Sequence, residues 1–470
     1  MKSKLLQRIC YACGTFGHDV FYAMISTYFM IFVTSNLFQS DNKERDVYMI
    51  GIITTIVLVL RVGELFIDPF IGNIIDKTKT RWGKFKPWVL SGAIVAAVAL
   101  ALLFTDLGGL TLSSPLTYFI LFTVLYLIMD IFYSAKDVAI WSMIPALSFD
   151  SHEREITATF ARIGSVFGGQ LITAIVMPIV LYFSLNQNGG AGDQTGWFAF
   201  ACIGGGIATL GAIILGLGTK EQESVLRQNK TDTGFKDVFK VLVKNDQLLW
   251  VACAYFVFGL GQNIVNNFNL YYFIYVLGDS EKFSFLGIIN VIIGLLAVAL
   301  FPMLTTMFSR RKLFLTSIAI MLLALILYAF AGTSLYMTLF AAGLFMLPQP
   351  LIFLVILMTI TDSVEYGQLK LGHRDEALIL CVRPLVDKLG GAISSAIIGF
   401  TAVWVGMTSG ATAETITPDN LKRFEFIMFA VPILCIVLGG ILYRVKVTLT
   451  EKEHVRIVRE LEEKWDELSK

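Results

Sequence analysis

Apolar segments long enough to cross a membrane fill most of this 470-residue chain. A membrane-spanning helix needs about 20 predominantly apolar residues, because inside a bilayer the backbone polar groups must be bonded within the segment. Twelve segments of the chain meet this requirement. They lie at residues 10–38, 47–75, 87–106, 115–147, 156–185, 197–219, 248–277, 283–308, 313–332, 335–361, 377–407 and 424–445. The sequence therefore predicts an all-α polytopic membrane protein with twelve transmembrane helices, whose first partner is the lipid bilayer.

Composition supports the membrane class. Only 16% of the residues are charged, 56% are hydrophobic and the mean hydropathy is +0.71. A soluble globular protein carries about 25% charged residues. The net charge of +1 argues against a nucleic-acid partner, because nucleic-acid binding needs a massed positive surface.

A long polar segment divides the chain into two groups of six helices. We expect an N-terminal six-helix bundle at 1–219, a linker at 220–247, a C-terminal six-helix bundle at 248–447 and a tail at 448–470. Two pseudo-symmetric halves around a site near the middle of the membrane are typical of secondary transporters. Inside the tenth helix, Pro348-Gln349-Pro350 should interrupt the helix, because proline lacks a backbone donor.

Loop charges predict the orientation of the chain. Short loops on the cytoplasmic side of a membrane protein are enriched in lysine and arginine. Such loops follow the second, eighth and tenth segments, whereas 105–114 and 186–195 contain no basic residue. Both termini are therefore expected in the cytoplasm of a cell-membrane protein.

The tail carries a helix-start signal. Thr450 and Glu453 form a capping box, and an approximate apolar stripe follows it. We expect an amphipathic cytoplasmic helix that packs on the protein or on the membrane surface. The alternative is a docking site for a regulatory partner.

Carboxylates stand inside the apolar segments. Glu64 and Asp68 are four residues apart, so both lie on one face of the same helix. An acid that faces lipid costs at least ~2.5 kcal/mol, so such residues normally face a bundle interior or a water-filled path. If their helices meet, Glu64, Asp68 and Asp137 are predicted to couple transport to a cation. The alternative is an ion pair that holds helices together, such as Arg61 with Asp68, or Lys136 with an acid.

Three further side chains suit a ligand that is rich in hydroxyl groups. Asp19 can accept two hydroxyls, Arg162 can donate a fork of hydrogen bonds, and Trp141 offers a flat apolar surface. Trp141 is one helical turn from Asp137, so both can face one cavity. The alternative for a tryptophan in a spanning helix is packing or a place in the interfacial belt.

The seventh segment is unusually rich in amides. They are Gln262, Asn263, Asn266, Asn267 and Asn269. Asn263 with Asn266 or Asn267 is expected to line a cavity, and the alternative is hydrogen bonding between helices.

A polar stretch near the end of the tenth segment contains candidate gating or coupling residues. They are Asp362, Glu365, His373, Arg374 and Glu376. Its acids could pair with the bases near Arg383, Asp387 and Lys388, and the alternative is a solvated loop. No metal-ligand spacing, nucleophile motif or phosphate loop is present, so we expect no enzyme, no catalytic residue, no metal site and no cofactor.

At these residues the chain resembles the glycoside–pentoside–hexuronide:cation symporters, a branch of the major facilitator fold. The motifs that carry the resemblance are Gly17-His-Asp19-Val-Phe-Tyr, Asp68-Pro-Phe-Ile-Gly72-Asn-Ile-Ile-Asp76, Gly83-Lys-Phe-Lys-Pro87-Trp, Lys136-Asp137-Val-Ala-Ile-Trp141, Asp150-Ser-His-Glu-Arg-Glu155 through Arg162, and Asp362-Ser-Val-Glu365-Tyr-Gly-Gln. The first segment, 132–164 and the stretch from Arg383 to Gly391 most resemble the lactose transporters of lactic acid bacteria. That group often carries a C-terminal phosphotransferase-like IIA domain. The sequence stops at Lys470, so we expect this domain to be absent or removed, and the resemblance implies a cytoplasmic regulator of the phosphotransferase type as an alternative partner.

The resemblance implies roles for individual residues. The sugar site would contain Asp19, Asp137, Trp141 and Arg162. The cation site would contain Glu64, Asp68, Asp137 and the hydroxyl of Ser134, with Lys388 as the compensating base. The resemblance further implies symport of lactose or another galactoside, such as melibiose or galactose, with a proton, and sugar exchange as a partial reaction. A sodium-coupled or pentoside-specific symporter of the same family is the alternative.

Overall fold

The computed structural model describes residues 2–40, 42–78, 80–147, 151–221, 243–372, 379, 382–408 and 410–468. Nearly all of its regular structure is helical. The helices of the first half of the chain are α1 (Lys2–Ala23), η1 (Met24–Tyr28), α2 (Phe29–Phe32), η2 (Val33–Leu37), α3 (Lys43–Lys77), α4 (Lys86–Leu103), α5 (Leu110–Ser113), α6 (Pro115–Leu147), α7 (Ser151–Phe183), η3 (Asn188–Gly190) and α8 (Gln194–Gly218). Those of the second half are α10 (Asp246–Tyr275), α11 (Phe283–Met307), α12 (Arg310–Ala329), α13 (Leu335–Met346), α14 (Gln349–Leu371), α16 (Val382–Val405), α17 (Pro418–Glu425), η5 (Phe426–Ala430), α18 (Val431–Lys446) and α19 (Glu451–Leu468).

Within these residues, 12 helical stretches are long and apolar enough to cross a membrane. The predicted twelve-helix, all-α architecture is thus confirmed. The predicted interruption of the tenth span is also present, since α13 ends at Met346 and α14 begins at Gln349.

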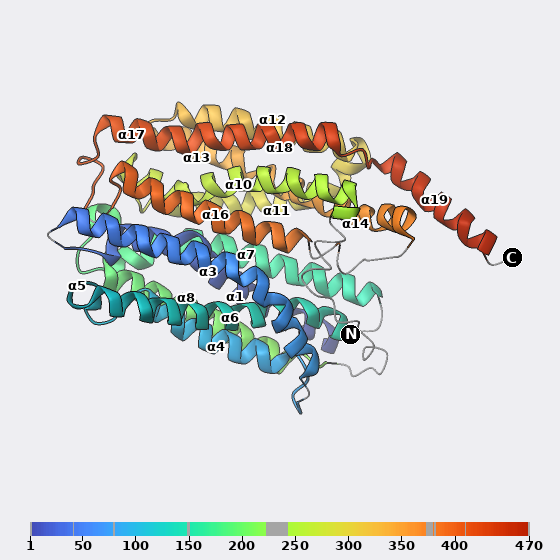
Figure 1. The fold of residues 1–470 in the computed structure, drawn as a ribbon, viewed down its shortest axis with the longest axis horizontal. Coiled ribbons are helices and arrows are strands. Elements are labelled where there is room, and N and C mark those ends of the chain that lie inside the picture. Colours follow the sequence, from blue (N-terminus) through green and yellow to red (C-terminus); the bar gives the residue numbers. More distant parts are fainter. Residues whose placement is uncertain are drawn as a thin grey trace. The chain divides into compact units, whose positions relative to one another are not determined.

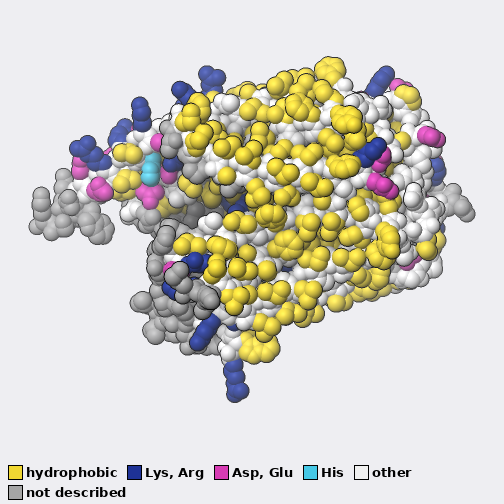
Figure 2. Space-filling model, turned by 180° about the vertical axis from the view of Figure 1, so that it is seen from behind, with side chains coloured by type: hydrophobic (Ala, Val, Ile, Leu, Met, Phe, Trp, Pro, Cys, Tyr) yellow, Lys and Arg dark blue, Asp and Glu magenta, His cyan; other side chains and the backbone are white. Residues whose placement is uncertain are grey.

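Large apolar side chains cover much of the surface. Leu116, Tyr182, Leu217 and Phe330 are each more than 70% exposed. In Figure 2 hydrophobic side chains occupy the broad middle of the face shown, and most charged side chains gather toward its left and right edges. A band of this kind is the surface that hydrocarbon tails solvate in a multi-pass membrane protein.

The chain forms two compact units. The first contains residues 1–232, 267–291 and 395–424, and the second contains 233–266, 292–394 and 425–470. Figure 1 shows α4, α6 and α8 side by side in the first unit, and α12 beside α18 in the second. The units divide between residues 232 and 233, within the predicted linker, and also within α10, α11 and α16. The division into two six-helix halves stays a prediction.

Glycines let α1 pack tightly against α7 in the first unit. A Cβ atom on Gly164 or Gly168 of α7 would overlap the backbone of Ala12 or Phe16 in α1. The hydroxyl of Thr15 donates to the carbonyl oxygen of Ala161 across the same interface at 2.8 Å. This backbone approach places the site residues of α1 beside those of α7.

The extension of α1 through η2 also contacts the later part of α10 within the first unit. The hydroxyls of Thr34 and Tyr271 lie 2.8 Å apart, and those of Ser35 and Tyr275 lie 3.0 Å apart. Buried hydroxyl pairs of this kind join helices where no water can solvate them.

In the second unit α12 packs against α13, α14 and α18, and α14 packs against α19. The rings of Phe314 and Tyr443 stack at 4.0 Å between centroids, and the Tyr443 hydroxyl lies 3.1 Å from that of Thr359. The predicted N-cap of α19 is present, since the Glu453 backbone N–H donates to the Thr450 hydroxyl. The tail helix is thereby positioned at the end of α14.

Candidate functional site

The two predicted acids of α3 lie on the side of that helix that meets α6. Glu64 is 8% exposed and accepts a hydrogen bond from the Ser134 hydroxyl at 2.8 Å. Asp68 lies one turn further along and is partly buried. The structure thus brings together Glu64 and Ser134, the contact expected of a cation site on α3 and α6.

Arg61 precedes these acids on α3 and binds three neighbouring segments. Its guanidinium donates to the Tyr126 hydroxyl of α6 at 3.0 Å, to the Ser395 hydroxyl of α16 at 3.0 Å and to the Ile25 carbonyl oxygen at 2.8 Å. These three bonds join α3 to α6, to α16 and to η1, and the ion pair of Arg61 with Asp68 stays a prediction.

Asp137 on α6 meets a histidine of α1. The Nε2 atom of His18 lies 3.0 Å from the Asp137 Oδ1 atom and 3.3 Å from the Tyr133 hydroxyl. The His18 ring stacks on that of Tyr133 at 5.2 Å and 4°, and His18 is only 3% exposed. Sequence reasoning missed His18, although a histidine beside Asp19 in an apolar segment was a signal that could have found it.

Asp19 lies at the same interface. Its carboxylate accepts a hydrogen bond from Ser165 of α7 and lies within electrostatic range of His18, Arg162 and Asp137. The four predicted sugar-site residues Asp19, Asp137, Trp141 and Arg162 therefore come from α1, α6 and α7, which enclose one region of the first unit. Trp141 is 36% exposed and Arg162 is exposed, so both are accessible from outside the helix packing.

Buried polar atoms in this region lack hydrogen-bond partners among the described residues. They are the Oδ2 atom of Asp19, the Nζ atom of Lys136 and the Nδ1 atom of His18. Lys136 is 1% exposed, lies 5.5 Å from the Phe21 ring centroid and interacts electrostatically with Asp19 and Asp137. An unpaired buried polar group is costly, so such a cluster indicates a place where a ligand or water completes the bonding.

The amides of α10 separate into two groups. Asn266 exchanges hydrogen bonds at 3.3 Å with Gln349 of α14, and Gln262 donates to the same residue at 3.0 Å. These bonds support the alternative reading, in which amides join helices. Asn263 faces Gly390 of α16, where an added Cβ would lie 3.6 Å from the amide nitrogen. Lys388 lies two residues earlier on α16 and is partly buried.

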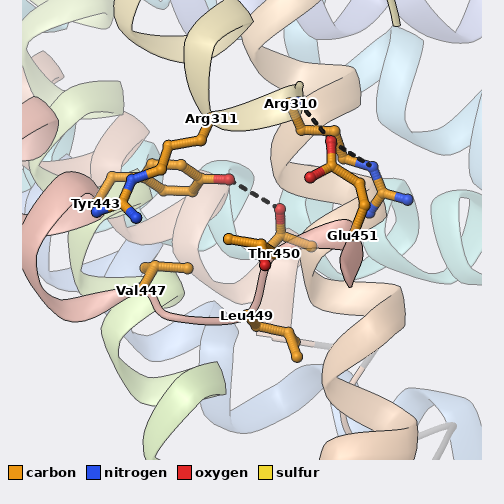
Figure 3. A pocket seen from close by; sticks show the side chains of 8 residues that line it. Arg310, Arg311, Tyr443, Val447, Leu449, Thr450 and Glu451 are labelled. Carbon is orange, nitrogen blue, oxygen red and sulfur yellow. Dashed lines mark hydrogen bonds and ion pairs between the residues drawn. The ribbon is translucent and has the colours of Figure 1, made fainter. Parts of the chain in front are cut away.

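The acids at the end of α14 are held by residues that sequence reasoning did not single out. A guanidinium nitrogen of Arg310 pairs with Asp362, and the Nε2 atom of His454 lies 3.8 Å from Asp362 and 3.5 Å from Glu365. Figure 3 shows Glu451 of the tail helix beside Arg310, whose backbone N–H donates to that carboxylate. The candidate gating acids therefore contact the start of α12 and the tail helix.

The structure describes only some of the remaining gating candidates and their predicted partners. Arg383 pairs with Asp387 one turn away on α16 at 2.7 Å, and its guanidinium lies over the Phe353 ring. His373, Arg374 and Glu376 fall outside the described residues. A search of the described residues finds no group of three His, Cys, Asp or Glu side chains that could hold a metal ion.

Comparisons with known proteins identify the family. The sequence model described as MFS/sugar transport protein matches residues 10–450. The chain belongs to this family. The major facilitator sugar transporters are transport proteins rather than enzymes, so the chain is a multi-pass membrane transporter, as the motifs predicted.

Two relatives from lactic acid bacteria cover almost the whole chain. The lactose permease of Lactobacillus delbrueckii subsp. bulgaricus is 51% identical over 98% of this chain and 73% of the relative. The raffinose carrier protein of Pediococcus pentosaceus is 50% identical over 97% of this chain and 72% of the relative.

A solved structure supports the fold alone. The crystal structure of a D-xylose-proton symporter superimposes with a TM-score of 0.62 at 14% identity, covering 93% of this chain and 96% of that one.

Proposed function

We propose that this transporter is a galactoside–proton symporter of the cell membrane, with both termini in the cytoplasm, that works by alternating access of two six-helix halves. The relatives support the substrate class. One is named for lactose and another for raffinose, and both sugars contain a galactosyl unit. Lactose is therefore the first substrate to test, with melibiose and galactose next.

The observation that carries the proposal is the set of unpaired polar atoms between α1 and α6. Asp19 supplies an acceptor and Lys136 supplies donors, both at buried atoms. A sugar hydroxyl both donates and accepts, so one ring can satisfy both groups. Trp141 lies one turn beyond Asp137 and offers an accessible apolar face for the C–H side of the ring. Arg162 adds a bidentate donor.

The acids of α3 are proposed to carry the coupling proton. The Glu64–Ser134 hydrogen bond supports this role, because a serine hydroxyl can donate to a carboxylate or accept from a protonated carboxyl group. Glu64 can therefore keep this contact in both protonation states. Asp68 and Asp137 share the proton, and Lys388 compensates the acids when the proton has left.

Sugar and proton must influence one another energetically for symport to occur. A ligand shifts the equilibrium between inward-facing and outward-facing states only by its difference in affinity for them. Ser134 and Asp137 lie on the same face of α6, separated by less than one turn. This short separation gives the proton on Glu64 and the sugar on Asp137 a common rigid element to act upon.

Asp362 and Glu365 belong to the proposed gating network at the cytoplasmic end of α14. Their contacts with Arg310 and His454 support a lock that joins α12, α14 and α19. His373, Arg374 and Glu376 stay predicted members of this network. The tail helix supports a second candidate role as the place where a cytoplasmic regulator acts.

A sodium-coupled or pentoside-specific symporter is the second candidate function. The isoprimeverose transporter of Lactiplantibacillus pentosus, 28% identical over 84% of this chain and 79% of the relative, favours keeping it. It would share the architecture and differ in the chemistry of the pocket.

Uptake of labelled lactose into proteoliposomes tests the proposal. With an inward proton gradient and no sodium, lactose should accumulate above the outside concentration, and a protonophore should abolish the accumulation. Uptake that requires sodium would show that sodium, and not the proton, is the coupling ion. No lactose uptake in either gradient would show that lactose is not a substrate, and pentosides would be assayed next.

A further inference from the structure

The His18 imidazole joins α1 to α6 between the two acids of the proposed sugar site. Its Nε2 atom is 3.0 Å from the Oδ1 atom of Asp137, and it is adjacent in sequence to Asp19. The ring is 3% exposed and lies almost parallel to that of Tyr133, at 4°. A histidine with this burial, ring stacking and close contact with a carboxylate has little freedom to rotate.

We propose that His18 is a positioning residue that holds the Asp137 carboxylate in the orientation that receives the sugar. The proposal rests on the proposed function, because it assigns Asp137 to sugar binding. His18 acts through Asp137 and is not itself a ligand of the sugar.

The contact fixes one oxygen of a carboxylate that is accessible to a ligand. The Asp137 side chain is 25% exposed, and the His18 Nε2 atom lies 3.0 Å from its Oδ1 atom. Fixing one carboxylate oxygen from a neighbouring helix orders the group before the ligand arrives. Groups ordered in advance lose less conformational entropy on binding, which raises affinity.

The stacked tyrosine extends this contact toward the proposed proton site. Tyr133 supports the flat face of His18, and the next residue on α6, Ser134, donates to Glu64. The position of His18 is therefore set by the same turn of α6 that holds Glu64. A shift of that turn during transport would move Asp137 and Ser134 together.

The contrasting explanation is that His18 only fills space between two helices. His18→Gln and His18→Phe separate the two explanations. Glutamine keeps an amide donor near the position of Nε2, whereas phenylalanine keeps the ring and its stacking and loses the donor. Tyr28→Phe is the matched control, since it removes another buried hydrogen bond of this unit, to Thr173 at 2.8 Å, away from the site.

Lactose affinity, measured by titration calorimetry on purified protein, is the first readout. We expect His18→Phe to weaken binding by about 10-fold or more, as the loss of a hydrogen bond to a charged group does, and His18→Gln to stay within about threefold of wild type. Tyr28→Phe should leave the affinity unchanged. Wild-type affinity in His18→Phe, or equal losses in both His18 variants, would overturn the positioning role.

A double-mutant cycle supplies a readout that needs no substrate. Thermal unfolding of His18→Phe, Asp137→Asn and the double variant, without sugar, should show losses that are less than additive, because each single change removes the same contact. Additive losses would overturn the contact itself. If the cycle shows coupling but the wild type binds neither lactose nor a panel of other sugars, the contact between His18 and Asp137 is supported. That outcome would contradict both the sugar function and the positioning role.

Discussion

Two groups of charged side chains, one around Asp19 and one around Asp362, are both withdrawn from solvent and yet are bonded differently. Around Asp362, the Arg310 guanidinium of α12 pairs with the carboxylate, and the His454 Nε2 atom of α19 lies 3.8 Å away without a hydrogen bond. Around Asp19, an acceptor oxygen and the Lys136 nitrogen are buried without hydrogen-bond partners in the described part of the chain. Both groups lie among apolar helices, and each contains a carboxylate, a histidine and a basic side chain.

We interpret this difference as one between a structural network and the proposed binding site. A buried charge whose partners come from the protein stabilises one arrangement of helices, and removing a partner destabilises that arrangement. A buried polar atom without a protein partner costs free energy until a ligand or water bonds to it. Substitutions in the first group should therefore change stability or gating, and substitutions in the second should change ligand binding.

The largest expected effect contrasts one acid from each group. Asp19→Asn should weaken lactose binding by roughly 100-fold, since each hydrogen bond to a charged acceptor contributes about 1.5–3 kcal/mol. Asp362→Asn should leave lactose affinity within about threefold, because its partners are protein groups. Calorimetric titration of both variants measures this contrast, and normal binding by Asp19→Asn would remove Asp19 from the site.

A second substitution sharpens the role of the α3 acids beside the Asp19 group. Glu64→Gln should abolish accumulation in a proton gradient, because glutamine cannot bind and release the proton. It should retain sugar exchange to within about threefold, since the amide can still bond to Ser134. Paired uptake and counterflow assays in proteoliposomes decide this, and equal loss of both activities would indicate a structural role for Glu64.

The Asp362 group should respond through stability. Arg310→Met removes the guanidinium from Asp362 and Glu451, and we expect it to lower the free energy of unfolding by about 2 kcal/mol. Arg310→Lys retains the charge and serves as the control. Thermal unfolding in detergent measures the difference, and an unchanged unfolding temperature in Arg310→Met would show that this network carries no stability.

The smallest expected effect concerns a fully paired carboxylate outside the membrane spans. Burial tends to raise the pKa of Asp193, but N–H donors from Gly196, Asn186 and Leu185 outweigh it and hold the pKa below its ordinary value. Because the folded-state pKa is depressed, this stabilisation is present above the unfolded-state pKa and is lost as pH falls through the folded-state value. Asp193→Ala should cost about 1 kcal/mol at neutral pH, as the loss of an N-cap side chain does. Thermal unfolding as a function of pH should show this difference shrinking in acid.

Much of the fold was predictable from the sequence because the bilayer permits so few solutions. Twelve apolar segments of sufficient length predicted twelve spanning helices, and Pro348 predicted the break between α13 and α14. Family motifs predicted that Glu64 and Ser134 would meet. These features depend on length, periodicity and residue type, which are local properties of the chain.

Partners across helices were less predictable, because a side chain's neighbours depend on how distant helices cross. Asn266 was predicted to line a cavity, which stays a prediction, and its hydrogen bonds to Gln349 of α14 were seen only in the structure. His18 stands beside Asp19 in an apolar segment, but its contact with Asp137 of another helix was not predictable, and His454 lies in a polar tail where nothing marks it as a partner of Asp362. Arg310 stands in an ordinary basic loop, and only its contact with Asp362 shows that it belongs to a network.

The sequence by itself determined that this protein spans a membrane, that its helices carry acids which cannot face lipid, and which transporter family it belongs to. The physical reason is that hydrophobic length and the cost of burying charge act on each segment separately. Only the tertiary structure decided which buried polar atoms of the described residues have hydrogen-bond partners in the protein and which do not. That distinction arises from helix packing, such as the close approach of α1 to α7 at Gly168, and no single segment contains it.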